Sequence, residues 1–226
     1  MQINDNLAEP VILDAAALEW VPSPAAGVQR RMLYREGAEV ARATSIVRYA
    51  AGSAFPPHVH SGGEEILVLS GTFQDEHGDY PAGSYFRNPP GTSHSPAAAE
   101  GCEIFVRLWQ FREGDHAQIV RRPGEGEAVS PREGVLSSRL LFDDGAERVV
   151  IEDWSGSASV TVANARGLEF LVVAGGLAIG EVFLGPQGWG RLPAGQDMIA
   201  TAGPQGVRIW IKDAPLQHAE ILKMPV

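Results

Sequence analysis

Residues 52–94 carry the most informative pattern in the sequence. This stretch opens with Gly52-Ser-Ala-Phe-Pro-Pro-His58-Val-His60-Ser-Gly-Gly-Glu64 and closes with Pro89-Pro-Gly-Thr-Ser-His94. Four of the six histidines of the protein lie inside this stretch. Three of them are placed where one first-row metal ion could be held, so the stretch predicts both a local architecture and a site.

The spacing of the candidate ligands follows from strand geometry. Side chains two apart on a strand point to the same face, so His58 and His60 can direct both imidazoles to one point. Glu64 has the same parity and follows a glycine-rich bend, whereas Glu65 should face away. A Pro-Pro-Gly turn then leads His94 into a new strand. Three imidazoles and one carboxylate form an N3O donor set, which suits Fe, Mn, Ni or Zn and suits Ca or Mg poorly.

In these motifs the sequence resembles the cupin family, and more closely the ChrR-like cupin domain, named for a bacterial anti-sigma factor. The first cupin motif is met at every position. The second is met except at its last position, where Ala98 replaces an asparagine that is not a metal ligand in the family. The resemblance implies a metal bound by His58, His60, Glu64 and His94. The matching positions are Gly52, His58, His60, Glu64 and Gly71, then Gly83, Pro89, Gly91 and His94.

After a charged, glycine-containing stretch at 112–129, which we interpret as a linker, the chain repeats itself. A repeat of this length indicates two copies of one fold. The copies match at residues 31–39 and 139–147, at 65–71 and 169–175, and at 89–91 and 193–195. In this alignment the four candidate ligands correspond to Val162, Asn164, Leu168 and Met198. None of these is a good ligand for a borderline divalent metal, so the second copy has lost the site.

Resemblance and repeat together imply an all-β protein with two tandem cupin domains, each a jelly-roll β-barrel. We predict a metal-binding ChrR-like cupin domain at 1–115 and a degenerate cupin domain without metal ligands at 116–226. The 26 glycines and 16 prolines indicate many turns and hence a β-rich chain. A hydrophobic content of 44% is sufficient for a real core.

Composition excludes several classes of partner. The net charge of −10 opposes binding to nucleic acid and to anionic membranes, because both require a basic surface. Residues 1–20 lack a basic start followed by an apolar run, and no segment reaches 18 apolar residues, so we expect a cytoplasmic protein. Cys102 is the only cysteine, which rules out an internal disulfide and for which we expect a buried, structural position.

Three functions remain open from the sequence. The first, which we favour, is a metal-dependent dioxygenase of small molecules, with one divalent metal per chain, zinc or iron before manganese or nickel. The alternative is a stand-alone metal- or ligand-binding sensor of a transcriptional stress response. No histidine precedes His58 and no cysteine precedes Cys102, so we expect no direct sigma-factor binding. A metal-free binding protein ranks last. A small-molecule ligand is expected in each case, and a homodimer is left open.

Overall fold

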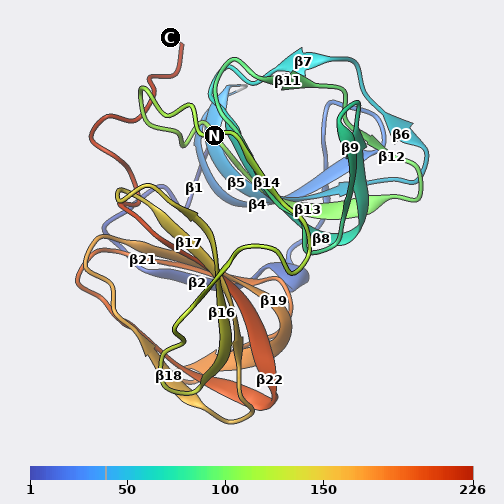
Figure 1. Cartoon of the computed structure of the whole chain (residues 1–226). Helices are drawn as coiled ribbons and strands as arrows, with labels where there is room; N and C mark the ends of the chain where they lie inside the picture. The colour runs from blue at the N-terminus through green and yellow to red at the C-terminus, as the bar shows by residue number, and fades with distance from the viewer. Residues whose placement is uncertain (39, 226) are drawn as a thin grey trace. The chain divides into compact units, whose positions relative to one another are not determined.

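The computed structural model describes residues 1–38 and 40–225 (Figure 1). Over these residues the regular structure is antiparallel β-sheet, with one short 3-10 turn, η1 (Ala15–Ala17), capped by the side chain of Asp14. The all-β prediction is confirmed. No helix in the described part of the chain is long and apolar enough to cross a membrane.

The chain forms two compact units. Unit 1 contains residues 1–5, residues 19–124 and the C-terminal segment from Gln217, and unit 2 contains residues 6–18 and 125–216. The sequence predicts continuous domains at 1–115 and 116–226, whereas each unit is assembled from separate segments. The reason is strand pairing: an early strand completes the sheet of unit 2, and a strand beyond residue 115 completes that of unit 1.

Unit 1 is a barrel with two layers. Its main sheet follows the order β1 (Gln2–Ile3), β4 (Val28–Gly37), β5 (Ala41–Tyr49), β13 (Cys102–Leu108), β8 (Glu64–Asp75), β10 (Tyr85–Asn88) and β14 (Ile119–Arg121). The shorter strands are β3 (Val21–Pro22), β6 (Ser53–Ala54), β7 (His58–Val59), β9 (Gly78–Pro81), β11 (Ser93–His94) and β12 (Ala97–Ala98). In Figure 1, β7 and β11 lie across the barrel from β4 and β5.

Unit 2 repeats this plan. Its sheet follows the order β15 (Glu127–Val129), β16 (Val135–Asp143), β17 (Arg148–Trp154), β22 (Met198–Asp213), β19 (Leu168–Ile179), β21 (Gly188–Leu192) and β2 (Val11–Asp14). Two short strands, β18 (Ser159–Val162) and β20 (Val182–Leu184), pair with β22 and β19. The stretch 112–129, expected to be a linker, instead contributes β14 to unit 1 and β15 to unit 2.

The strand pairing of the two units shows the repeat directly. In unit 1 His58 of β7 pairs with His94 of β11, and in unit 2 Val162 pairs with Met198 in the corresponding place. Val162 and Met198 belong to a hydrophobic core together with Leu168. Because these apolar side chains fill the interior of unit 2, three of the four positions that carry ligand-type residues in unit 1 serve packing there.

Candidate metal centre

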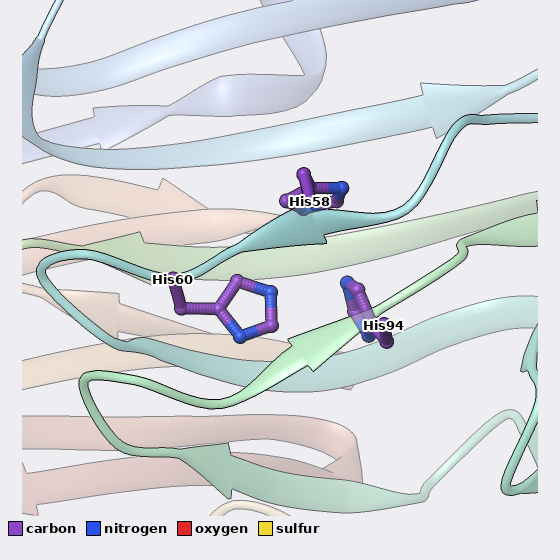
Figure 2. A group of neighbouring side chains, drawn as sticks. All are labelled: His58, His60 and His94. Atoms are coloured by element: carbon purple, nitrogen blue, oxygen red, sulfur yellow. The ribbon is translucent and has the colours of Figure 1, made fainter.

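Three histidines from two strands meet at one wall of the unit 1 barrel. His58 lies on β7, His60 follows in the loop after β7, and His94 lies on β11 (Figure 2). The ring centroids are 5.1 Å apart for His58 and His60, 5.0 Å for His58 and His94, and 4.5 Å for His60 and His94. One nitrogen from each ring lies within 4.8 Å of the others, a grouping that could hold a metal ion.

Glu64 contacts two of these histidines from the first position of β8. Its Oε1 lies 3.2 Å from Nε2 of His60 and 3.4 Å from Nε2 of His94. Glu64, His60 and His94 are buried, whereas His58 is exposed at the edge of the group. The structure therefore brings together all four residues that the sequence predicts as ligands, with the carboxylate on the side of His60 and His94.

The bend between His60 and Glu64 requires its glycines because aromatic rings pack directly against the backbone. A Cβ atom on Gly62 would lie 2.0 Å from Cδ2 of Trp109, and one on Gly63 would lie 2.5 Å from Cδ2 of Phe111. Gly63 also has a φ of +73°, a conformation that side chains disfavour. The two rings thus fix the backbone that sets Glu64 beside His60.

The buried imidazoles are each held from the Nδ1 side. Nδ1 of His60 lies 2.9 Å from the hydroxyl Oγ1 of Thr92, which in turn donates to the carbonyl of Pro89. Nδ1 of His94 lies 3.3 Å from Oδ2 of Asp75. Both rings therefore keep Nε2 directed to the carboxylate of Glu64. Contacts of this kind on the far nitrogen orient histidine ligands and set their basicity.

The protonation of the group is set by burial and by its own charges. Burial, followed by the neighbouring His94 and His58 rings, lowers the pKa of His60 to about 3. Burial and then His94 also lower the pKa of His58. For His94, burial acts downward, but contacts with Asp75 and Glu64 outweigh it and raise the pKa. His60 and His58 are thus neutral at pH 7, the form in which imidazole binds metals.

Glu64 has an environment that favours its protonated form when no cation is near. Burial raises the pKa of this carboxyl group, and the charge of His94 and a hydrogen bond from Asn88 act in the opposite direction. Nδ2 of Asn88 donates to Oε1 of Glu64 at 2.9 Å. A buried carboxylate of this kind gains stability from a bound cation, which offsets the cost of its desolvation.

These residues fit a divalent transition metal. Nε2 of His60 is buried and has no hydrogen-bond partner among the described residues. Such an atom is costly unless something binds it, and it lies next to two further imidazoles and a carboxylate. The N3O donor set is of the borderline type that first-row transition metals prefer.

The group opens onto a cavity of about 490 Å³ inside the barrel. This volume is in the range of small-molecule sites. Its walls are mainly aliphatic and aromatic, and His58, Glu64 and His94 form part of one side. The other polar lining residues are Ser23, Arg30 and Tyr49, and the apolar ones include Val28, Val47, Phe55, Ile66, Phe73, Ile104, Val106 and Leu108.

Other candidate residues lie outside this centre. Glu65 points away from it, as strand parity predicts, and accepts hydrogen bonds from the Tyr85 hydroxyl at 2.6 Å and from Arg107 at 2.5 Å. Cys102 is buried, and burial raises the pKa of its thiol to about 12, so it is not a reactive thiolate. His77, in the turn between β8 and β9, is exposed.

The family described as ChrR Cupin-like domain matches residues 8–112. These residues are a ChrR-like cupin domain. The match covers β4 to β13 and the whole His58, His60, Glu64 and His94 group, so the resemblance inferred from the two motifs is confirmed. Among curated proteins, none matches the chain significantly.

Several solved structures are similar to this chain over both units, and not only over the ChrR-like cupin domain. A candidate dioxygenase from Nostoc punctiforme aligns with a TM-score of 0.70 at 14% identity, covering 97% of this chain and 88% of that one. Bacterial pirin YhhW from Escherichia coli in complex with nickel(II) gives 0.67 at 15%, covering 92% and 99%. Oxalate decarboxylase from Lactobacillus farciminis in complex with formate gives 0.63 at 11%, covering 91% and 86%. At these identities the similarity shows the fold, and the predicted tandem cupin architecture is confirmed.

Proposed function

We propose that the ChrR-like cupin domain binds one divalent transition metal through His58, His60, Glu64 and His94, and that the protein is a metal-dependent dioxygenase of a small oxygenated molecule. The observation that carries this proposal is the buried Nε2 of His60. It has no hydrogen-bond partner in the described structure and lies beside Glu64 and His94 at the wall of a mostly apolar cavity.

Each residue has a separate task in this proposal. His60 and His94 would hold the metal through Nε2, because Oγ1 of Thr92 lies 2.9 Å from Nδ1 of His60 and Oδ2 of Asp75 lies 3.3 Å from Nδ1 of His94. Glu64 would supply the one negative charge, and His58 would complete the set at the exposed edge. A redox-active ion such as iron, when bound, supplies activation of dioxygen and of a chelating substrate.

The cavity contributes the environment for such a reaction. Its aliphatic and aromatic walls limit the access of water, which strengthens electrostatic interactions inside. Tyr49 stacks edge-on against Phe55 and Phe73, with ring centroids 5.4 Å and 5.8 Å apart. Burial and then the charge of Glu64 raise the pKa of Tyr49 well above its usual value, so its hydroxyl stays protonated and can donate a hydrogen bond to a ligand.

Unit 2 supports a stoichiometry of one metal per chain. Val162, Leu168 and Met198 pack in its hydrophobic core, and the amide of Asn164 donates to the carbonyls of Pro193 and Gln196. YhhW, which has this fold, was solved in complex with nickel(II), and this supports a divalent metal without fixing its number per chain. Zinc and iron remain the metals that we favour.

The test is elemental analysis of protein freshly purified from its native host, paired with oxygen uptake in the presence of small β-diketones and hydroxyketones. We expect about one iron per chain, as the single donor set predicts, and oxygen consumption that depends on the added substrate. A metal-free protein, or oxygen uptake that is the same with and without these compounds, would refute the proposed dioxygenase function.

A second candidate function is a sensor that binds a metal or a small ligand. The family match favours it, because the family is named for the cupin-like domain of ChrR. Zinc at about one per chain without oxygen uptake would favour this function, since zinc does not cycle electrons. In that case the ligand of the cavity becomes the signal, and no sigma-factor binding is expected of the chain itself.

A further inference from the structure

One cationic side chain, Arg30, lines the cavity at a distance from the histidines. It lies on β4, where residues two apart share a face. Val28 on the same strand also lines the cavity, as do Val47 and Tyr49 of the neighbouring β5. Arg30 pairs with Val47 in the sheet. It therefore belongs to the inward-facing set of residues.

Arg30 has no partner for its charge within residues 1–38 and 40–225. No hydrogen bond or ion pair of its guanidinium occurs there, and its Nε is buried without a hydrogen-bond partner. Two buried arginines of unit 1 are ion-paired, Arg87 with Asp115 at 2.8 Å and Arg107 with Glu65 at 2.5 Å, whereas the half-buried Arg30 is not. The charge of Arg30 instead adds to the effect of burial in lowering the pKa of Arg35. A cation left in this state favours an incoming anion.

The repeat shows that the fold does not need an arginine here. In the alignment of residues 31–39 with 139–147, the position of unit 2 that corresponds to Arg30 is Ser138. The Ser138 hydroxyl donates to Glu152, its partner across the sheet, at 3.3 Å. Unit 2, whose interior is packed, thus has a small side chain with a partner in the protein. Unit 1, whose interior is open, has an arginine without one.

Strand register separates Arg30 from the candidate metal ligands along the barrel. Glu64 pairs with Leu108, and Leu108 pairs with Ala43 of β5, whereas Arg30 pairs with Val47 of the same strand. The two levels are thus four residues apart, which is about 13 Å of strand. Arg30 and Glu64 reach into one cavity from these two levels, and apolar side chains line the space between them.

We infer that Arg30 binds a carboxylate, and that the ligand of the cavity is an organic acid with an apolar body. A single guanidinium matches one carboxylate, whereas a phosphate, with its greater charge, is usually met by several cations. The end of the acid remote from its carboxylate then faces His58, Glu64 and His94. This orientation at the metal end rests on the proposed function, but the preference for an anion rests on Arg30 alone.

The experiment compares 5-phenylvalerate with its uncharged amide, 5-phenylvaleramide, by isothermal titration calorimetry on the metal-loaded protein. We expect the wild type to bind the acid about tenfold or more tightly than the amide, the size of one charge-assisted hydrogen bond. Arg30→Gln should remove this preference, and Arg30→Lys should retain most of it. The matched control is Arg31→Gln on the opposite face of the strand, where Arg31 stacks on Trp20, and it should keep the preference.

Equal affinity of the wild type for acid and amide, including no measurable binding of either, would overturn the inference. So would an equal loss in the Arg30→Gln and Arg31→Gln variants. Thermal unfolding distinguishes a ligand-binding role of Arg30 from a structural one. Because Arg30→Gln removes an unpaired cation, it should not lower the melting temperature. The metal content of the same samples separates the two proposals. A protein that holds its full metal but does not prefer the acid overturns only the role of Arg30. A protein that prefers the acid but does not hold a metal overturns only the metal-dependent function.

Discussion

Replacing Asn88 by alanine tests how strongly the protein favours the ionised form of Glu64. Asn88 is buried on β10, and its Nδ2 donates a hydrogen bond to Oε1 of Glu64 at 2.9 Å. Burial already raises the pKa of Glu64, and this hydrogen bond opposes the rise. Asn88→Ala should therefore raise the pKa of Glu64 further and make the carboxylate harder to form.

The size of the effect follows from the kind of bond that is lost. A hydrogen bond to a charged group contributes about 1.5–3 kcal/mol, which corresponds to about 1–2 pKa units. Metal binding requires the carboxylate. The pH below which metal is released should thus move upward by about 1–2 units, and affinity at neutral pH should fall about 10–100-fold.

The assay is competition with a chelator for the bound metal across a pH series. Asn4→Ala is the control, because the Asn4 amide also donates a hydrogen bond in unit 1, partly buried and away from the centre, at 2.7 Å to the carbonyl of Leu33. It should leave metal affinity unchanged. An Asn88→Ala variant with wild-type metal affinity and wild-type release of metal in acid would show that Asn88 does not stabilise Glu64 as a ligand.

The remaining predictions concern the ligand set, its supporting bend and the single thiol. His60→Ala should remove most of the metal measured by elemental analysis while Met198→Ala leaves it unchanged, and equal effects would contradict the alignment of the two units. Gly62→Ala places a Cβ 2.0 Å from Cδ2 of Trp109 and should lower stability in denaturant by about 1–3 kcal/mol, together with metal affinity; unchanged unfolding would show that the ring yields freely. Native Cys102, with its pKa raised to about 12, should resist a thiol reagent at pH 8 that modifies the unfolded chain, and rapid reaction of the native protein would disprove its burial.

The local motifs carried most of the predictable information. The even spacing of His58, His60 and Glu64 and the turn before His94 predict a common face, and the structure brings these four residues together. Parity also separated Glu64 from Glu65, which lies on the other side of the strand. Such patterns act over a few residues, where strand geometry alone decides the direction of a side chain.

Long-range partners could not be predicted in the same way. Asp75 and Thr92 reach the far nitrogens of His94 and His60 from other parts of the barrel, and no local spacing links them. Arg30 follows no motif, and only the register of β4 against β5 places it in the cavity. The charged stretch at 112–129 suggested a linker, but sheet edges in both units recruit it as strands. In each case the decisive contact is tertiary.

The most direct test of the metal centre is an anomalous difference map from crystals of protein purified from its native host, recorded at the absorption edge of the metal found by elemental analysis. We predict one peak per chain, within about 2.0–2.3 Å of ligand atoms from His58, His60, Glu64 and His94. A map without a peak at this group, or with a peak in unit 2 instead, would contradict the account.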